Sequence, residues 1–94
     1  MFDVTISDNG EILLSGRFDA SQVEKAKSIF NKIEKSSTVD FKDLEYISSA
    51  GLGVLLMTQK RLNESGQRLK LINMNKHIWD VFHYAGFNNI FEIE

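Results

Sequence analysis

The sequence contains neither cysteine nor proline, and each absence removes a class of structure. Without cysteine the chain forms no disulfide framework and no thiolate metal site, and its side chains carry out no thiol redox chemistry. Without proline, the breaks between helices and strands must come from glycine, asparagine and aspartate. The composition therefore excludes a disulfide-stapled domain and a thiolate zinc module.

A strong charge of one sign and a long apolar run are missing as well. Eleven Lys and Arg residues stand against 13 Asp and Glu residues, so the formal net charge is −2. This charge creates no field that attracts nucleic acid or an anionic membrane. No apolar run approaches the roughly 20 residues that cross a bilayer, and the first residues are acidic where a signal peptide is basic. We therefore expect a cytoplasmic protein without a membrane span or a nucleic-acid partner.

The length of 94 residues and the apolar fraction of 43% suit one globular domain with a modest core. No repeat, linker or low-complexity segment divides the chain. We accordingly assign residues 1–94 to one domain and expect a monomer.

Hydrophobic periodicity predicts a hairpin followed by a helix in the first third of the chain. Residues 2–7 alternate between apolar and polar, and an Asp-Asn-Gly turn separates them from the apolar run 12–14. A capping box formed by Ser21 and Glu24 predicts the start of the helix. The buried stripe of that helix is expected to comprise Val23, Ala26, Phe30 and Ile33.

The remaining residues predict strands alternating with two more helices. We expect a strand at residues 38–41, a turn at residues 42–45, and a helix that begins at residues 46–49 and ends near Ser65, before Gly66. Its apolar face is expected to comprise Leu52, Val54, Leu55, Leu56, Met57 and Leu62. A strand at residues 68–72, a third helix ending at Gly86 and a strand at residues 90–93 follow; the apolar face of the third helix is expected to comprise Ile78, Val81, Phe82 and Ala85.

The predicted element order is therefore β-β-α-β-α-β-α-β. Helices that cross between parallel strands connect right-handed and pack back onto the sheet. We expect an α/β fold with a mixed sheet of about four to five strands and helices packed mainly on one face.

Catalytic constellations are not apparent in the sequence. The two histidines, His77 and His83, are six residues apart and therefore fall on different faces of the third predicted helix. Gly51 and Gly53 lack the lysine of a Walker motif and the third glycine of a dinucleotide fingerprint. An enzyme is the least supported class, and we expect no cofactor and no metal.

The polar start of the second predicted helix leaves several interpretations open. Gly51 and Gly53 either let this helix pack tightly on its own sheet or present a flat landing surface for a partner. Ser48 and Ser49 are each suited to capping the helix. A phosphate at this position would gain from the exposed amides and the helix dipole, and it would add about −1.5 to −2 charges to the surface.

Three short segments carry a family signature. Residues 16–19 read Gly-Arg-Phe-Asp, residues 39–41 read Val-Asp-Phe, and residues 46–55 read Tyr-Ile-Ser-Ser-Ala-Gly-Leu-Gly-Val-Leu. Together they resemble the STAS domains of bacterial anti-sigma factor antagonists, and the element order extends the resemblance to nearly the whole chain. One position departs from the family pattern, because Ser48 stands where the family usually has aspartate.

The resemblance implies a regulatory binding protein with a phosphorylation switch. It places the phosphorylated serine at Ser49 and leaves Ser48 as a secondary phosphorylation site or an N-cap. It implies that the surroundings of the phosphoserine and the partner-binding surface comprise Asp19, Asp40, Ala50, Gly51, Leu52 and Gly53.

The partners implied are an anti-sigma factor that is also an ATP-dependent serine kinase and a metal-dependent serine phosphatase. The unphosphorylated form would bind the anti-sigma factor and release a sigma factor, so the chain would act in transcription regulation and signal transduction. The alternative is a non-switching STAS scaffold subunit of a signalling complex or a lipid transporter, in which the two serines act only as a cap.

Overall fold

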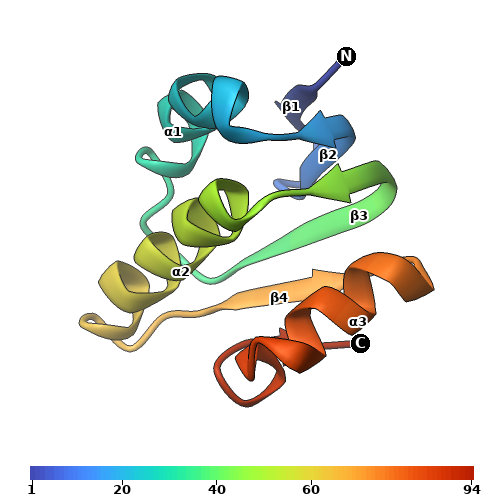
Figure 1. Ribbon diagram of the computed structural model, residues 1–94. Coiled ribbons are helices and arrows are strands. Elements are labelled where there is room, and N and C mark those ends of the chain that lie inside the picture. Colours follow the sequence, from blue (N-terminus) through green and yellow to red (C-terminus); the bar gives the residue numbers. More distant parts are fainter.

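The computed structural model, which describes residues 1–94, contains one five-stranded sheet (Figure 1). The order of the strands in the sheet is the same as their order in the chain. The first pair is antiparallel and the other three pairs are parallel, so the sheet is mixed as predicted. The strands are β1 (Asp3–Ile6), β2 (Ile12–Phe18), β3 (Ser37–Ile47), β4 (Leu69–Ile72) and β5 (Glu92–Ile93).

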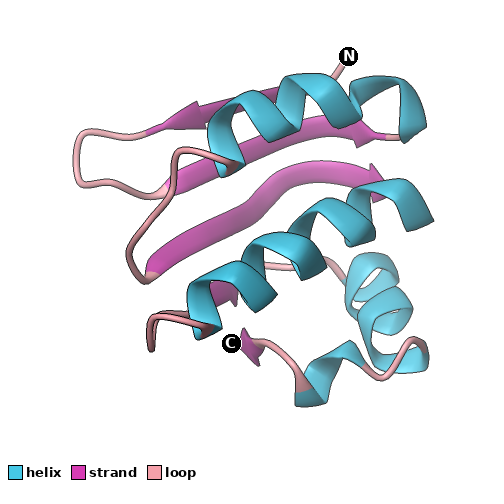
Figure 2. Cartoon of the chain, turned by 90° about the vertical axis from the view of Figure 1, so that its left-hand side faces the viewer, coloured by secondary structure: helices cyan, strands magenta, loops and turns pink.

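Three α-helices connect the parallel strands. Figure 2 shows α1 (Val23–Phe30) and α2 (Ser49–Asn63) lying across one face of the sheet. The third helix, α3 (Lys76–Tyr84), packs near β3 and the residue that precedes β5, because the ring centroid of Phe82 lies 5.9 Å from that of Phe41 and 5.8 Å from that of Phe91. Short 3-10 helices, η1 (Ala20–Gln22) and η2 (Phe87–Asn89), precede α1 and β5.

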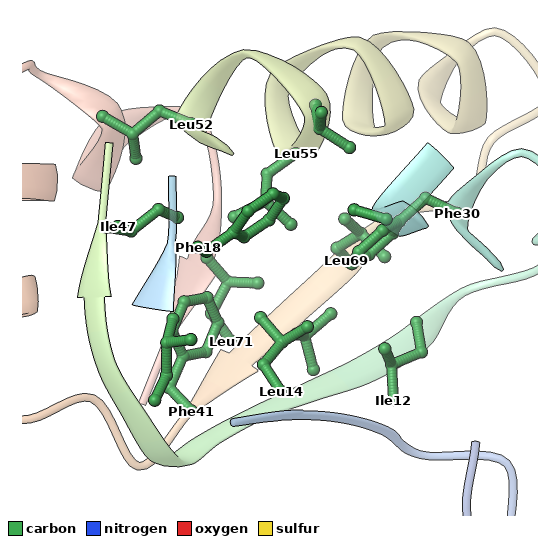
Figure 3. Close-up of a cluster of buried hydrophobic side chains, with 14 of the residues drawn as sticks. Ile12, Leu14, Phe18, Phe30, Phe41, Ile47, Leu52, Leu55, Leu69 and Leu71 are labelled. Atoms are coloured by element: carbon green, nitrogen blue, oxygen red, sulfur yellow. The ribbon is translucent and has the colours of Figure 1, made fainter. Parts of the chain in front are cut away.

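A single cluster of 21 buried apolar residues fills the space between the helices and the sheet. Because side chains alternate along a strand, Ile12 and Leu14 of β2 point into this core while Leu13 points away from it. Leu55 of α2 lies above Phe18 in the same cluster (Figure 3). Predicted fold class and observed fold therefore agree.

Strand β3 corrects one prediction. The turn expected at residues 42–45 is wrong, since β3 continues through it for 11 residues in all. The register shows the reason: Leu13 pairs with Asp40 but Ser15 pairs with Asp43, so β3 holds one extra residue in a bulge there. A second extra residue follows, since Gly16 pairs with Leu44 but Arg17 pairs with Tyr46. At the first bulge two charged residues that are adjacent in the sequence are both exposed. Adjacent exposed charged residues are also typical of a turn, which is why the sequence predicted one.

The start of α1 corrects a second prediction. No capping box forms at Ser21 and Glu24, because α1 begins at Val23 with Gln22 as an N-cap that makes no side-chain hydrogen bond. The cap lies further upstream, where the carboxylate of Asp19 accepts a hydrogen bond from the amide of Ser21 at the start of η1. The chain therefore enters α1 through an extra turn of 3-10 helix.

The predicted apolar faces hold in part. Ala26, Phe30 and Ile33 are buried and Val23 is partly buried, although Ile33 lies beyond the end of α1. Met57 is exposed over 67% of its surface, so its place on the buried face of α2 is wrong. The other exception is Ala85, which follows α3 and is exposed.

The inner face of α2 instead carries a buried polar residue that ties the helix to two other segments. The side-chain oxygen of Gln59 accepts a hydrogen bond from the amide of Leu69 at 2.8 Å. Its side-chain nitrogen donates to the carbonyl of Ile90, also at 2.8 Å. Both polar atoms of the amide are therefore satisfied, as a buried polar group requires.

Candidate functional site

The candidate site lies where β2 and β3 end side by side and α2 begins. Phe18 pairs with Ile47 at the ends of the two parallel strands. The amide of Ser48 then donates a hydrogen bond to the carbonyl of Phe18 at 2.9 Å. This bond joins the end of β2 to the start of α2, so residues some 30 positions apart in the chain share one surface.

Ser48 caps α2. Its backbone is extended, and its hydroxyl oxygen accepts a hydrogen bond from the amide of Gly51 at 3.2 Å. Its carbonyl accepts the first helical hydrogen bond, from the amide of Leu52. The hydroxyl of Ser48 is therefore engaged in holding the helix start.

Ser49 has no part in the cap. It is the first residue of α2 and is exposed. Its hydroxyl enters none of the side-chain hydrogen bonds that organise the helix start, where Ser48 is the cap. Ala50, which follows, is also exposed. A free hydroxyl next to unpaired helix amides is a suitable position for an added phosphate.

The two glycines of α2 have different surroundings. A methyl group added at Gly51 would lie 2.9 Å from the Ile47 side chain and 3.1 Å from Phe18, so Gly51 is needed for close packing on the sheet. A methyl group added at Gly53 would meet nothing within 4 Å. Gly51 therefore agrees with the interpretation that glycine lets the helix pack tightly on its own sheet. Gly53 agrees with the interpretation that glycine presents a flat surface to a partner.

Four uncharged residues and one lysine form a line along α2 that is exposed except at the partly buried Gly53. They recur at spacings of three and four residues and therefore share one side of the helix. Met57 lies on this line and is exposed, although it is a large apolar residue. We call this line the outer stripe of α2; its residues are Ser49, Ala50, Gly53, Met57 and Lys60.

Asp19 is brought to this site. It follows the last residue of β2, and its carboxylate accepts hydrogen bonds from the hydroxyl of Ser21 at 2.6 Å and from the Ser21 amide at 3.0 Å. The Ser21 hydroxyl is the largest influence and lowers the pKa of Asp19; desolvation opposes it, and the Ser21 amide and the charges of Arg17 and the N-terminus lower the pKa further. The site therefore contains a fixed negative charge at neutral pH.

Asp40 is not brought to this site. It lies in the middle of β3, seven residues before Ile47, which at the rise of a strand is on the order of 20 Å. Its carboxylate accepts hydrogen bonds from the Lys42 amide at 2.9 Å and from the Asn73 side chain at 3.1 Å. A role for Asp40 in partner binding would require a partner that reaches along the sheet.

Sequence reasoning assigned no role to a cation and an aromatic ring beside the site. The guanidinium carbon of Arg17 lies 4.3 Å from the ring centroid of Tyr46, and the two residues are paired across β2 and β3. The sequence held a usable signal: Arg17 precedes Asp19 by two residues, and Tyr46 precedes Ser48 by two. Residues at that spacing on adjacent strand ends share a face.

Neither a metal site nor a helix that could span a membrane is found in residues 1–94. No group of three or more His, Asp or Glu side chains is placed to hold a metal ion. None of the helices is both long enough and apolar enough to cross a membrane.

Residues 3–92 match the family model described as "Mlab, STAS domain". A curated relative from Bordetella bronchiseptica, BtrV, bears a provisional name as an anti-sigma factor antagonist and is 36% identical over 74 residues. That match covers 79% of this chain but only 58% of BtrV, so the chain spans less than two thirds of that relative's length. The anti-sigma-B factor antagonist of Listeria monocytogenes is 25% identical over 92 residues, covering 94% of this chain and 81% of the relative.

The fold has solved counterparts. The phosphorylated form of the Bacillus cell fate determinant SpoIIAA superposes with a TM-score of 0.71 at 18% identity. The superposition covers all of this chain and 91% of the SpoIIAA chain. At this identity, the similarity concerns the arrangement of the sheet and helices.

Proposed function

The chain belongs to the STAS domain family, and on that premise we propose that it is an anti-sigma factor antagonist controlled by phosphorylation of Ser49. The observation that carries this proposal is the division of labour between two adjacent serines. Ser48 holds the start of α2 through its hydroxyl, while the hydroxyl of Ser49 is exposed and free. The names of the curated relatives support the same class of regulatory binding protein.

In this proposal, the unphosphorylated chain binds an anti-sigma factor through the outer stripe of α2. The bound anti-sigma factor releases its sigma factor, and transcription from the corresponding promoters begins. Gly53 supports this docking mode because it leaves the helix backbone open to close approach, and Met57 supplies an exposed apolar contact. The chain acts in the cytoplasm of a bacterium, where sigma factors work.

The anti-sigma factor is also the kinase. The Ser49 oxygen attacks the γ-phosphorus of ATP, the bond to the ADP oxygen breaks, and the hydroxyl proton passes to a base of the kinase. The chain supplies only the acceptor, so it needs no cofactor. A metal-dependent serine phosphatase removes the phosphate and restores the binding form.

The phosphate switches binding through charge. It adds about −1.5 to −2 charges at a stripe that carries no acidic residue. The amides at the start of α2 stabilise the dianion in the free protein, whereas a docked partner would have to bury it. Since every 1.4 kcal/mol changes affinity tenfold, one buried phosphate is enough to end binding.

The first test is mass spectrometry of the chain purified from its own cells under several growth conditions. We expect phosphate on Ser49 in a fraction that changes with growth conditions. In parallel, immobilised wild type, Ser49→Ala and Ser49→Asp chains are exposed to extract of the same cells. Wild type and Ser49→Ala should retain an ATP-dependent serine kinase, and Ser49→Asp should lose it.

A matched control separates charge at the stripe from charge elsewhere. Ser28 is an exposed serine of α1, away from the outer stripe, so Ser28→Asp should retain the kinase as wild type does. Equal retention by Ser49→Asp and wild type, with no phosphate under any condition, would contradict the switch. That result would favour the non-switching scaffold subunit of a signalling complex or a lipid transporter.

A further inference from the structure

The three arginines of the chain are used in three different ways. Arg61 donates from both terminal nitrogens to the carbonyls of Ile33 and Phe30, each at 2.8 Å, and so fastens the end of α1 to α2. Arg68 forms an ion pair with Glu92 at 3.9 Å. Arg17 takes part in none of the five ion pairs of the protein.

Arg17 is nevertheless held in place. Its guanidinium stacks over the ring of Tyr46 at 4.3 Å, and Tyr46 is half-buried. A stacked guanidinium is attracted to the face of the ring, and its N–H groups, which lie in the guanidinium plane, stay available to another acceptor. Arg17 is therefore an exposed, oriented donor group that makes no hydrogen bond or ion pair within the chain, although its charge acts on the nearby Asp19 carboxylate.

The position of Arg17 connects it with the proposed docking site. Arg17 and Tyr46 form the next-to-last pair of β2 and β3, and the last pair leads directly into Asp19 and Ser48. Arg17 is therefore two residues before Asp19 in the chain, and Tyr46 is two residues before Ser48, the residue next to Ser49. Because the buried Phe18 faces α2, the exposed Arg17 points to the opposite face of the sheet, and a partner contacts both Arg17 and the start of α2 by extending past the ends of β2 and β3.

The chemistry of Arg17 selects the group that it binds. A planar guanidinium donates two parallel hydrogen bonds to a carboxylate or a phosphate group. An isolated arginine in a chain of net charge −2 does not form a surface for nucleic acid, which needs several neighbouring cations. A carboxylate of a docked protein is therefore the fitting acceptor.

We propose that the Arg17–Tyr46 pair binds an acidic side chain of the protein partner that docks at the start of α2 and thereby selects that partner. This inference rests on the proposed function, since it assumes a partner at this end of the sheet. Arg17 supplies the paired hydrogen bonds, and Tyr46 holds the guanidinium in the orientation that makes them. The same pair also adds an electrostatic contribution that steers the partner to Ser49.

The experiment measures retention of the serine kinase from cell extract by immobilised unphosphorylated chains. Arg17→Ala should weaken retention by about tenfold, as expected for the loss of a hydrogen bond between charged groups. Arg17→Lys should be weaker than wild type, because an ammonium group cannot form the paired bonds. Tyr46→Phe, which keeps the ring, should bind better than Tyr46→Leu, which removes it.

Controls show whether the loss is specific. Arg68→Ala removes an exposed arginine outside the docking site and should leave retention unchanged. The thermal midpoint of Arg17→Ala should fall only slightly, because the exposed side chain makes no ion pair and loses one cation–π contact at an exposed site. Rising salt should weaken wild type more than Arg17→Ala, since part of the wild-type affinity is the charge contact.

The outcomes separate this inference from the proposed function. Equal retention by wild type and Arg17→Ala would overturn the inference and leave the phosphorylation switch intact. Retention of no kinase by any chain, without phosphate on Ser49, would overturn both. If Arg17→Ala alters only the behaviour of the phosphorylated chain, then Arg17 pairs with the protein's own phosphate and the inference is wrong.

Discussion

The two sides of α2 differ in almost everything but their shared backbone. The inner side is packed so closely that Gly51 leaves no room for a methyl group, and Leu55 is fully buried. The outer side holds a free serine hydroxyl, an open glycine and an exposed methionine: Ser49, Gly53 and Met57. One helix thus separates the residues that maintain the fold from those proposed to bind a partner.

The comparison shows that similar residues in the same helix need not do similar work. Adjacent serines, two glycines two positions apart and two large apolar residues two positions apart each divide between the sides. Paired substitutions can therefore test the division, because each substitution on the inner side has a chemically similar counterpart on the outer side.

The largest expected effect comes from the apolar pair. Leu55→Ala should lower the free energy of unfolding by about 2–5 kcal/mol, because it removes a fully buried side chain and leaves a cavity. Met57→Ala should change it by less than about 0.5 kcal/mol, since Met57 is largely exposed. Urea denaturation of both variants measures the difference, and comparable losses would contradict the division.

The glycine pair should respond with opposite signs. Gly51→Ala should destabilise the protein by about 1–2 kcal/mol, because overpacking against Ile47 and Phe18 outweighs the gain in helix propensity. Gly53→Ala should stabilise it by up to about 1 kcal/mol, since nothing lies within 4 Å of the added methyl group. Thermal unfolding of the two variants provides the measurement, and a loss at Gly53 would show that its surroundings are not open.

The serine pair should show a smaller difference. Ser48→Ala removes the N-cap of α2 and should cost about 1 kcal/mol. Ser49→Ala removes a free hydroxyl and should cost less than about 0.5 kcal/mol while abolishing phosphate incorporation. Chemical denaturation together with mass spectrometry separates the two roles; an equal cost at both positions would mean that Ser49 also holds the helix start.

The smallest effect concerns Asp19 and depends on pH. Hydrogen bonds from Ser21 lower the pKa of Asp19 on folding, so the ionised carboxylate stabilises the folded protein above the ordinary value of 3.8. That stabilisation is lost as the pH falls through the lower pKa of the folded state. Asp19→Asn should therefore have a lower thermal midpoint than wild type at about pH 7, and the gap should narrow towards about pH 3. A gap that stays constant with pH would exclude the charge as its source.

Periodicity was sufficient to predict most of the fold. The alternation in β2 and the leucine spacing of α2 each arise because one face of the element packs on the core. Packing on the core therefore determines the local structure of both elements. Strand β3 could not be predicted as one element, because its bulges depend on the register with β2. The capping box at Ser21 failed for a related reason, since the carboxylate of Asp19, at the end of β2, accepts a hydrogen bond from the Ser21 amide that Glu24 would otherwise engage.

The candidate site could be predicted only where one segment of chain contains it. The motif spanning residues 46–55 placed Ser48 and Ser49 at the start of a helix, as the structure has them. The pairing of Arg17 with Tyr46 joins two segments whose proximity depends on strand order. The separation of Asp40 from the site likewise depends on the length of β3.

The arrangement of the sheet also bears on how the chain folds during synthesis. Because each strand lies beside the strand that precedes it in the chain, every new strand leaving the ribosome finds its pairing edge already formed. No strand has to be inserted between two others, so folding can proceed by addition at one growing edge. Until β4 is made, one edge of β3 has no hydrogen-bonding partner. During that interval the nascent chain can pair through this edge with the strands of other chains.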